Sequence, residues 1–134
     1  MEVQFNDSTR YNKNPAQKYT INSYDINAFT RTLFDMLDRR ICNLSPDVKR
    51  EFKKLYIAYK LDTNFADIVV QKQRLRISLN IKFSEIHDPK GLCKDITGLG
   101  RWGNGDVEVF FEHTSEIDDV MELVEQSYKK QADE

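Results

Sequence analysis

The stretch RLRISLNI (residues 74–81) decides the fold class, because its polar and apolar residues alternate without a break. Successive side chains of a strand point to opposite faces, so one face here is apolar and the other carries Arg, Ser and Asn. Such alternation is typical of an antiparallel sheet with one face on the core. The apolar residues are Leu75, Ile77, Leu79 and Ile81. We therefore expect a strand with one buried face.

Three further segments predict strands around this one. KLYIAYK (residues 54–60) and FADIVVQ (residues 65–71) are rich in aromatic or β-branched side chains, which favour a pleated sheet. A long loop follows residue 81, with a helical turn expected at residues 89–94. VEVFF (residues 107–111) then predicts a fourth strand.

Two amphipathic stripes predict helices before and after the strands, because their apolar residues recur at spacings of three and four. The first stripe covers residues 26–44, with Ser23 or Asp25 as its cap and Ser45-Pro46 as its end. The second covers residues 117–128, behind Thr114-Ser115 as its cap.

The order helix, three strands, loop, strand, helix predicts the α+β class. We expect an antiparallel sheet of about four strands with an N-terminal and a C-terminal helix packed on one face. Residues 1–22 are polar and without a sustained period, which predicts a tail or linker. Residues 23–131 are then a single α+β domain.

Composition limits the classes of protein to consider. The 134 residues are 40% hydrophobic and 31% charged, which fits one globular domain. We expect no membrane span, because no apolar run approaches about 18 residues. The N-terminus shows no secretory signal, so a cytoplasmic protein is expected.

This sequence has few residues in patterns typical of catalytic or metal-binding sites. Cys42 and Cys93 cannot form a disulfide framework, and neither they nor the two histidines, His87 and His113, show the spacing of a zinc site. We expect no metal and no cofactor. Asp62, Asp67, Asp95 and Asp106 are the acidic residues that a small enzyme would use if they converged. The sequence leaves enzymatic activity open and leans against it.

The net charge of −2 conceals a strong segregation along the chain. Residues 49–82 carry nine basic and three acidic side chains, whereas residues 83–134 carry five basic and thirteen acidic ones. One interpretation is that these blocks are two solvated faces that attract each other within the domain. The other is that the basic block meets an anionic partner.

A short basic row is the first candidate binding site. Arg74 and Arg76 are two residues apart, so on a strand they project to the same side about 7 Å from each other, close to the spacing of nucleic-acid phosphates. Lys72 extends the row if the strand begins early. A solubilising strand face would show the same pattern.

A glycine-rich segment with the only tryptophan is the second candidate site. All five glycines lie in residues 91–105, and residues 98–103 spell G-x-G-x-x-G. A dinucleotide site needs a strand before this motif and a helix after it, and here a strand follows. The glycines would supply positive φ for a loop that ends in a tight turn. The residues assigned to loop geometry are Gly98, Gly100, Gly103, Asn104 and Gly105.

The functional alternative for this loop is an anion-binding concavity. Backbone N–H groups and Arg101 would bind the anion, beside the face of Trp102.

Four blocks of the sequence resemble a known domain. They are YIAYK (residues 56–60), NFADIVVQKQRLRISLN (residues 64–80), DPKGLCKDITGLGRWGNGDVEV (residues 88–109) and VMELVEQSYKKQ (residues 120–131). They are similar to an uncharacterised prokaryotic domain at the C-terminus of longer chains, whose N-terminal regions are NucS-like nucleases or GmrSD-type restriction endonucleases. Some relatives carry the label "predicted transport protein". The resemblance implies an accessory module of a nuclease or phage-defence system, and it supplies no catalytic residue.

Two functions follow as hypotheses. The first is a non-catalytic recognition domain that binds nucleic acid or a nucleotide-like anion through Lys72, Arg74, Arg76, Arg101 and Trp102. A nuclease domain in the same or a partner chain would then be its associate. The alternative is a protein-interaction or dimerisation domain, in which the charge blocks of two copies pair around Tyr56, Tyr59 and Trp102.

Overall fold

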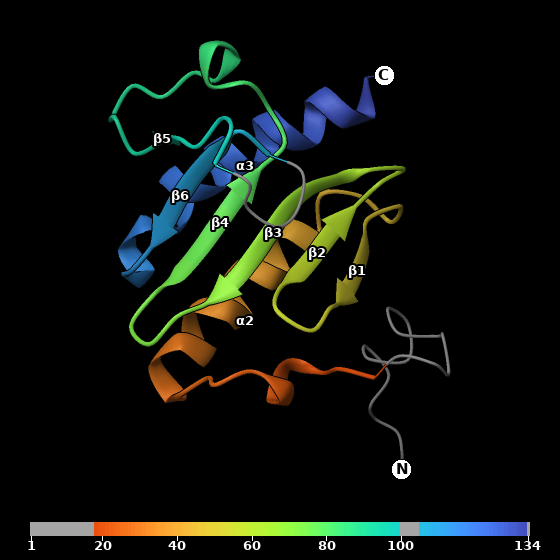
Figure 1. Ribbon diagram of the computed structural model, residues 1–134, viewed down its shortest axis with the longest axis vertical. Coiled ribbons are helices and arrows are strands. Elements are labelled where there is room, and N and C mark those ends of the chain that lie inside the picture. The colour runs from red at the N-terminus through yellow and green to blue at the C-terminus, as the bar shows by residue number, and fades with distance from the viewer. Residues whose placement is uncertain (1–17, 100–104, 134) are drawn as a thin grey trace.

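A six-stranded antiparallel sheet forms one layer of the molecule, and two helices form the other (Figure 1). The computed structural model describes residues 18–99 and 105–133. The strands lie in the order β1-β2-β3-β4-β6-β5, and each neighbouring pair is antiparallel. The elements are η1 (Ile21–Ser23), α2 (Ala28–Cys42), β1 (Lys49–Phe52), β2 (Ile57–Lys60), β3 (Asn64–Val70), β4 (Leu75–Leu79), η2 (Phe83–Glu85), β5 (Lys94–Asp95), β6 (Val107–Phe111), η3 (Thr114–Glu116) and α3 (Ile117–Ala132).

The α+β class, the antiparallel sheet and the two helices agree with the sequence-based expectation, but the expected number of about four strands was wrong. The two additional strands occupy the edges of the sheet. β1 has the sequence KREF, in which three charged residues hide the period of two. β5 has two exposed residues and replaces the end of the helical turn expected at residues 89–94.

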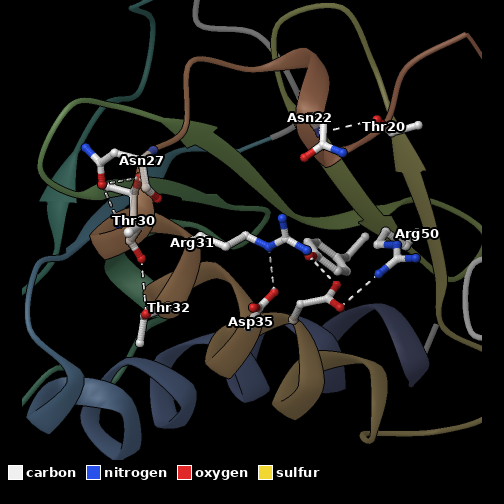
Figure 2. A network of polar contacts seen from close by, with 11 residues as sticks. Thr20, Asn22, Asn27, Thr30, Arg31, Thr32, Asp35 and Arg50 are labelled. Carbon is white, nitrogen blue, oxygen red and sulfur yellow. Dashed lines mark hydrogen bonds and ion pairs between the residues drawn. The ribbon is translucent and has the colours of Figure 1, made fainter.

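The helix α2 begins later than the sequence suggested. Its cap is Asn27, whose side-chain oxygen accepts a hydrogen bond from the Thr30 N–H at 2.8 Å, while the Thr30 hydroxyl accepts one from the Asn27 N–H (Figure 2). This reciprocal capping box satisfies two backbone donors at once. The helix ends at Cys42, before the expected stop at Ser45-Pro46.

The helix α3 is preceded by a short 3-10 turn rather than capped by Thr114 or Ser115. The Glu116 carboxylate accepts hydrogen bonds from the N–H groups of Glu112 and His113, at 2.8 and 2.9 Å. This carboxylate therefore fixes the passage from β6 into the helix layer.

The core lies between the sheet and the helices. Leu75, Ile77 and Leu79 of β4 are buried, as their alternation predicted. The register places Ile68 of β3 and Val109 of β6 beside Ile77, so the apolar row continues across the sheet. Buried residues of α2 and α3 complete this core; they are Leu33, Phe34, Leu37, Ile41, Val120, Met121, Leu123 and Val124.

The segment before α2 is tied to the sheet by Tyr24. Its hydroxyl donates to the carbonyl oxygens of Lys53 at 2.6 Å and Tyr56 at 3.2 Å. Burial raises the pKa of Tyr24 to about 12, because the phenolate would lose its hydration there. Tyr19 and Ile21 also pack against the core. No helix in residues 18–99 or 105–133 has the length and apolar character needed to cross a bilayer.

Candidate functional site

A cleft of about 990 Å³ opens at one end of the sheet, where the β3–β4 hairpin, the start of α2 and the end of β6 come together. Figure 1 shows the hairpin tip and the first turn of α2 at the lower left of the molecule. The lining residues are Asn27, Ala28, Phe29, Gln71, Lys72, Gln73, Arg74, Glu112 and His113. This cleft contains two of the residues that the sequence proposed for anion binding.

Lys72 lies in the hairpin turn and not in a strand. The Gln71 N–H donates to the Arg74 carbonyl at 3.0 Å, which leaves Lys72 and Gln73 as the two residues of the turn. The Asn27 side-chain amide donates to the Lys72 carbonyl at 2.8 Å and joins the turn to the start of α2. The Lys72 side chain is exposed and forms no ion pair within the described residues.

Arg74 is held in place at the wall of the cleft. Its Nε donates to the Gln71 side-chain oxygen at 2.7 Å, and its Nη1 lies 3.3 Å from the Glu112 carboxylate. The guanidinium carbon lies 3.7 Å from the centre of the Phe110 ring, a cation–π arrangement. These contacts orient the guanidinium, and they use only two of its five N–H donors.

Arg76 belongs to a different surface. Its side chain is only 15% exposed, and its Nε lies 3.7 Å from the carboxylate of Glu108. It does not line the cleft. The three expected members of the basic row are therefore divided: Lys72 and Arg74 come together, and Arg76 does not join them.

The sheet face opposite the helices holds a row of buried polar residues. Asp67, Ser78 and Glu108 are directly opposite one another on β3, β4 and β6, and they are 2%, 5% and 1% exposed. The Asn64 amide donates to the Asp67 carboxylate at 2.8 Å. The sequence offered Asp67 as one of four acidic residues, but Glu108 was missed. The sequence signal for Glu108 was the alternation of VEV (residues 107–109), which places Glu108 on the face opposite its apolar neighbours.

Within the same described part of the chain, no group of three or more His, Cys, Asp and Glu side chains comes together as a metal site would require. The register separates the aspartates that the sequence grouped. Asp95 lies opposite Val107 in the ladder, whereas Asp67 shares its row with Glu108, which lies opposite Lys94. Asp67 and Asp95 therefore project to opposite faces of the sheet.

β5 lies within the glycine-rich segment and pairs with β6, and the Ile96 N–H donates to the Asp106 carbonyl at 2.8 Å beside this pairing. The short strand β5 thus precedes the motif at residues 98–103 in the sequence, and β6 follows it. Gly98 has a φ of +78°, as expected for a turn glycine. Gly105 is required for another reason: a Cβ there would lie 2.5 Å from the Leu79 carbonyl oxygen. Gly100, Arg101, Trp102, Gly103 and Asn104 lie outside the described residues.

Much of the basic block is engaged in ion pairs within the domain. Lys53 and Lys60 both contact Glu51, at 3.1 and 3.2 Å, and these contacts lower the pKa of Glu51 despite its partial burial. Arg50 is buried and contacts Asp38 at 2.8 Å. Intramolecular attraction therefore accounts for several charges of residues 49–82.

The fold and this cleft define a two-layer α+β domain with a mixed polar and cationic hollow at one end. The chain belongs to the DUF5655 family, a domain of unknown function, whose model matches residues 21–131.

A relative named "Uncharacterized protein" from Haemophilus influenzae is 41% identical over 101 residues. The match covers 75% of this chain but only 33% of the relative, so the chain spans about a third of that protein. No solved structure matches the chain.

Proposed function

We propose that this domain is a non-catalytic recognition module that binds nucleic acid or a nucleotide-like anion in the cleft beside the β3–β4 hairpin. The observation that carries the proposal is the convergence of Lys72 and Arg74 on one hollow. Lys72 offers an ammonium group with no ion-pair partner among residues 18–99 and 105–133. Arg74 offers a guanidinium already oriented by Gln71 and Phe110.

The side chains of the cleft can bind both the phosphate and the base of such a ligand. Phosphate binds well to the fork of an arginine and to a lysine ammonium. Phe29 lines the same hollow and is 46% exposed, and an exposed aromatic ring is a platform on which a base stacks. Arg101 and Trp102 remain part of the proposal from their sequence alone.

The length of the relative supports an accessory role. A domain that matches one third of a longer protein is a module on which another part of that protein can depend. We propose that the partner is a nuclease domain of a DNA-targeting or phage-defence system, as the sequence resemblance implies.

The test is a binding titration of wild type and single variants with 3′-labelled DNA and RNA oligonucleotides, followed by fluorescence anisotropy. Lys72→Ala is expected to weaken binding and to lower the slope of log affinity against log salt by about 0.7 to 0.9, the value for one lost phosphate contact. Lys54→Ala is the matched control, because Lys54 is also exposed but does not line the cleft.

If Lys54→Ala weakens binding and Lys72→Ala does not, the cleft is not the binding site. If the wild type binds no nucleic acid or nucleotide even at low salt, the recognition function is wrong, and the interaction-domain alternative takes its place.

A further inference from the structure

We infer that the cleft takes a single phosphorylated nucleotide, either free or at the end of a strand, and not the continuous backbone of a duplex. This inference rests on the proposed function of the cleft and specifies its ligand. It is carried by the arrangement of free and engaged cations, by the size of the hollow, and by one carboxylate at its wall.

Within residues 18–99 and 105–133, the cationic side chains are not arranged as a continuous track beside the cleft. A duplex presents phosphates in two continuous rows, so a protein that follows it needs basic side chains spread along one surface. Among the described residues, Arg50, Arg76, Lys53 and Lys60 all lie within 4 Å of acidic partners. The exposed lysines Lys49, Lys54 and Lys82 do not line the cleft. Lys72 and Arg74 are therefore the only described lysine and arginine side chains that line the cleft.

The hollow has the size and lining of a small-molecule site. Pockets for such ligands measure about 300 to 1,000 Å³, and this cleft measures about 990 Å³. Its wall holds two cations for a phosphate, the Phe29 ring for a base, and the Gln73 side-chain amide for hydrogen bonds. A single nucleotide has one phosphate, one base and polar atoms for these protein groups to bind.

Glu112 makes the site selective for ligands that can compete for Arg74. Its carboxylate lies 3.3 Å from the Arg74 guanidinium and lines the cleft. A terminal phosphate carries about two negative charges at neutral pH, whereas a backbone phosphodiester carries one. The terminal phosphate therefore competes better with Glu112 for the guanidinium. Replacing this carboxylate by a neutral amide should raise the affinity for the phosphate.

The experiment compares one single-stranded oligonucleotide with a 5′-phosphate, the same oligonucleotide with a 5′-hydroxyl, the corresponding blunt duplex with 5′-hydroxyl ends, and adenosine 5′-monophosphate. All strands carry their label at the 3′ end. The wild type is expected to bind the phosphorylated strand about tenfold or more tightly than the hydroxyl strand or the duplex, the ratio typical of hydrogen bonds to a charged group.

Two variants with opposite expected effects keep the inference falsifiable. Lys72→Ala is expected to abolish the preference for the 5′-phosphate, and Glu112→Gln is expected to raise the affinity for it by about fivefold. The controls are Lys54→Ala and Glu122→Gln, which change the same charges at exposed positions outside the cleft. Unfolding curves confirm that each variant is folded.

The outcomes separate this inference from the proposed function. Competition by adenosine 5′-monophosphate identifies a free nucleotide as ligand, and binding of the phosphorylated strand without such competition identifies a strand end. If all strands bind equally and Lys72→Ala weakens each of them, the cleft binds nucleic acid but the inference about a single nucleotide is overturned. If no probe binds, both the inference and the proposed function are overturned.

Discussion

At the scale of single residues, Asp38 of α2 joins the helix layer to two strands. Its carboxylate accepts hydrogen bonds from the Arg50 guanidinium at 2.8 Å and from the Tyr59 hydroxyl at 2.7 Å. Tyr59 is fully buried, and burial raises its pKa well above the usual value. Tyr59 therefore cannot form the aromatic interface that the sequence suggested, and it belongs to the core.

We predict that Asp38→Ala lowers the free energy of unfolding by about 3 kcal/mol or more, because it removes the carboxylate that accepts hydrogen bonds from the buried Arg50 guanidinium and the buried Tyr59 hydroxyl. Asp35→Ala on the same helix is the control. Asp35 pairs with Arg31 (Figure 2). Their side chains are 51% and 45% exposed, and such surface pairs contribute about 0.5 kcal/mol or less. Urea denaturation measures both changes. Equal losses in the two variants would show that the Asp38 network is energetically unimportant.

At the scale of elements, the chain just before β6 lies close against the end of β4, where Leu79 pairs with Val107. Gly105 permits this approach, because any side chain there would collide with the Leu79 backbone. Gly91 has a different role: its φ is +66°, and a Cβ there would meet no atom within 4 Å. Gly105 is therefore required by close packing, and Gly91 is favoured by its backbone conformation.

We predict that Gly105→Ala lowers stability by about 2 kcal/mol or more, since the backbone of β4 or β6 has to move to accept the methyl group. Gly91→Ala should cost only about 1 kcal/mol, the strain of an L-residue at positive φ. Thermal unfolding compares the variants, and amide hydrogen exchange locates the change. The prediction fails if Gly105→Ala leaves exchange in β4 and β6 unaltered.

At the scale of the whole molecule, the opposite charge blocks contact each other inside one chain. Arg74 pairs with Glu112 across the β3–β4 hairpin and the end of β6, and Arg76 pairs with Glu108 within the sheet. Charges of the acidic block are engaged elsewhere, as in the pairs of Arg40 with Asp118 and of Lys90 with Asp119. These contacts leave less charge for pairing between copies.

We therefore predict that the protein stays monomeric by light scattering at both low and moderate salt. Pairing of charge blocks between two copies would instead give a mass that rises with concentration at low salt and falls as salt screens the charges over about 10 Å. Arg74→Glu gives a second readout, because a dimer held by the basic block would be weakened by it. A salt-sensitive dimer would favour the interaction-domain alternative over the recognition module.

The sequence predicted the local structure correctly where its periodicity is strong. Alternation in residues 74–81 placed β4 and its buried face, and spacings of three and four placed both helices, because these patterns repeat over many residues. Short strands could not be predicted from the sequence pattern. β1 and β5 have four and two residues and owe their pairing to neighbouring strands.

Which basic residues share a surface depends on tertiary contacts that the sequence pattern does not contain. The sequence placed Lys72, Arg74 and Arg76 in one row, since a strand period treats every second residue alike. The hairpin turn at residues 72–73 removes Lys72 from the strand. Arg74 and Arg76 then pair with different carboxylates that are distant in sequence, Glu112 and Glu108. Charge pairing and burial depend on contacts between segments that the chain separates, so the cleft beside α2 emerged only once the two layers were packed together.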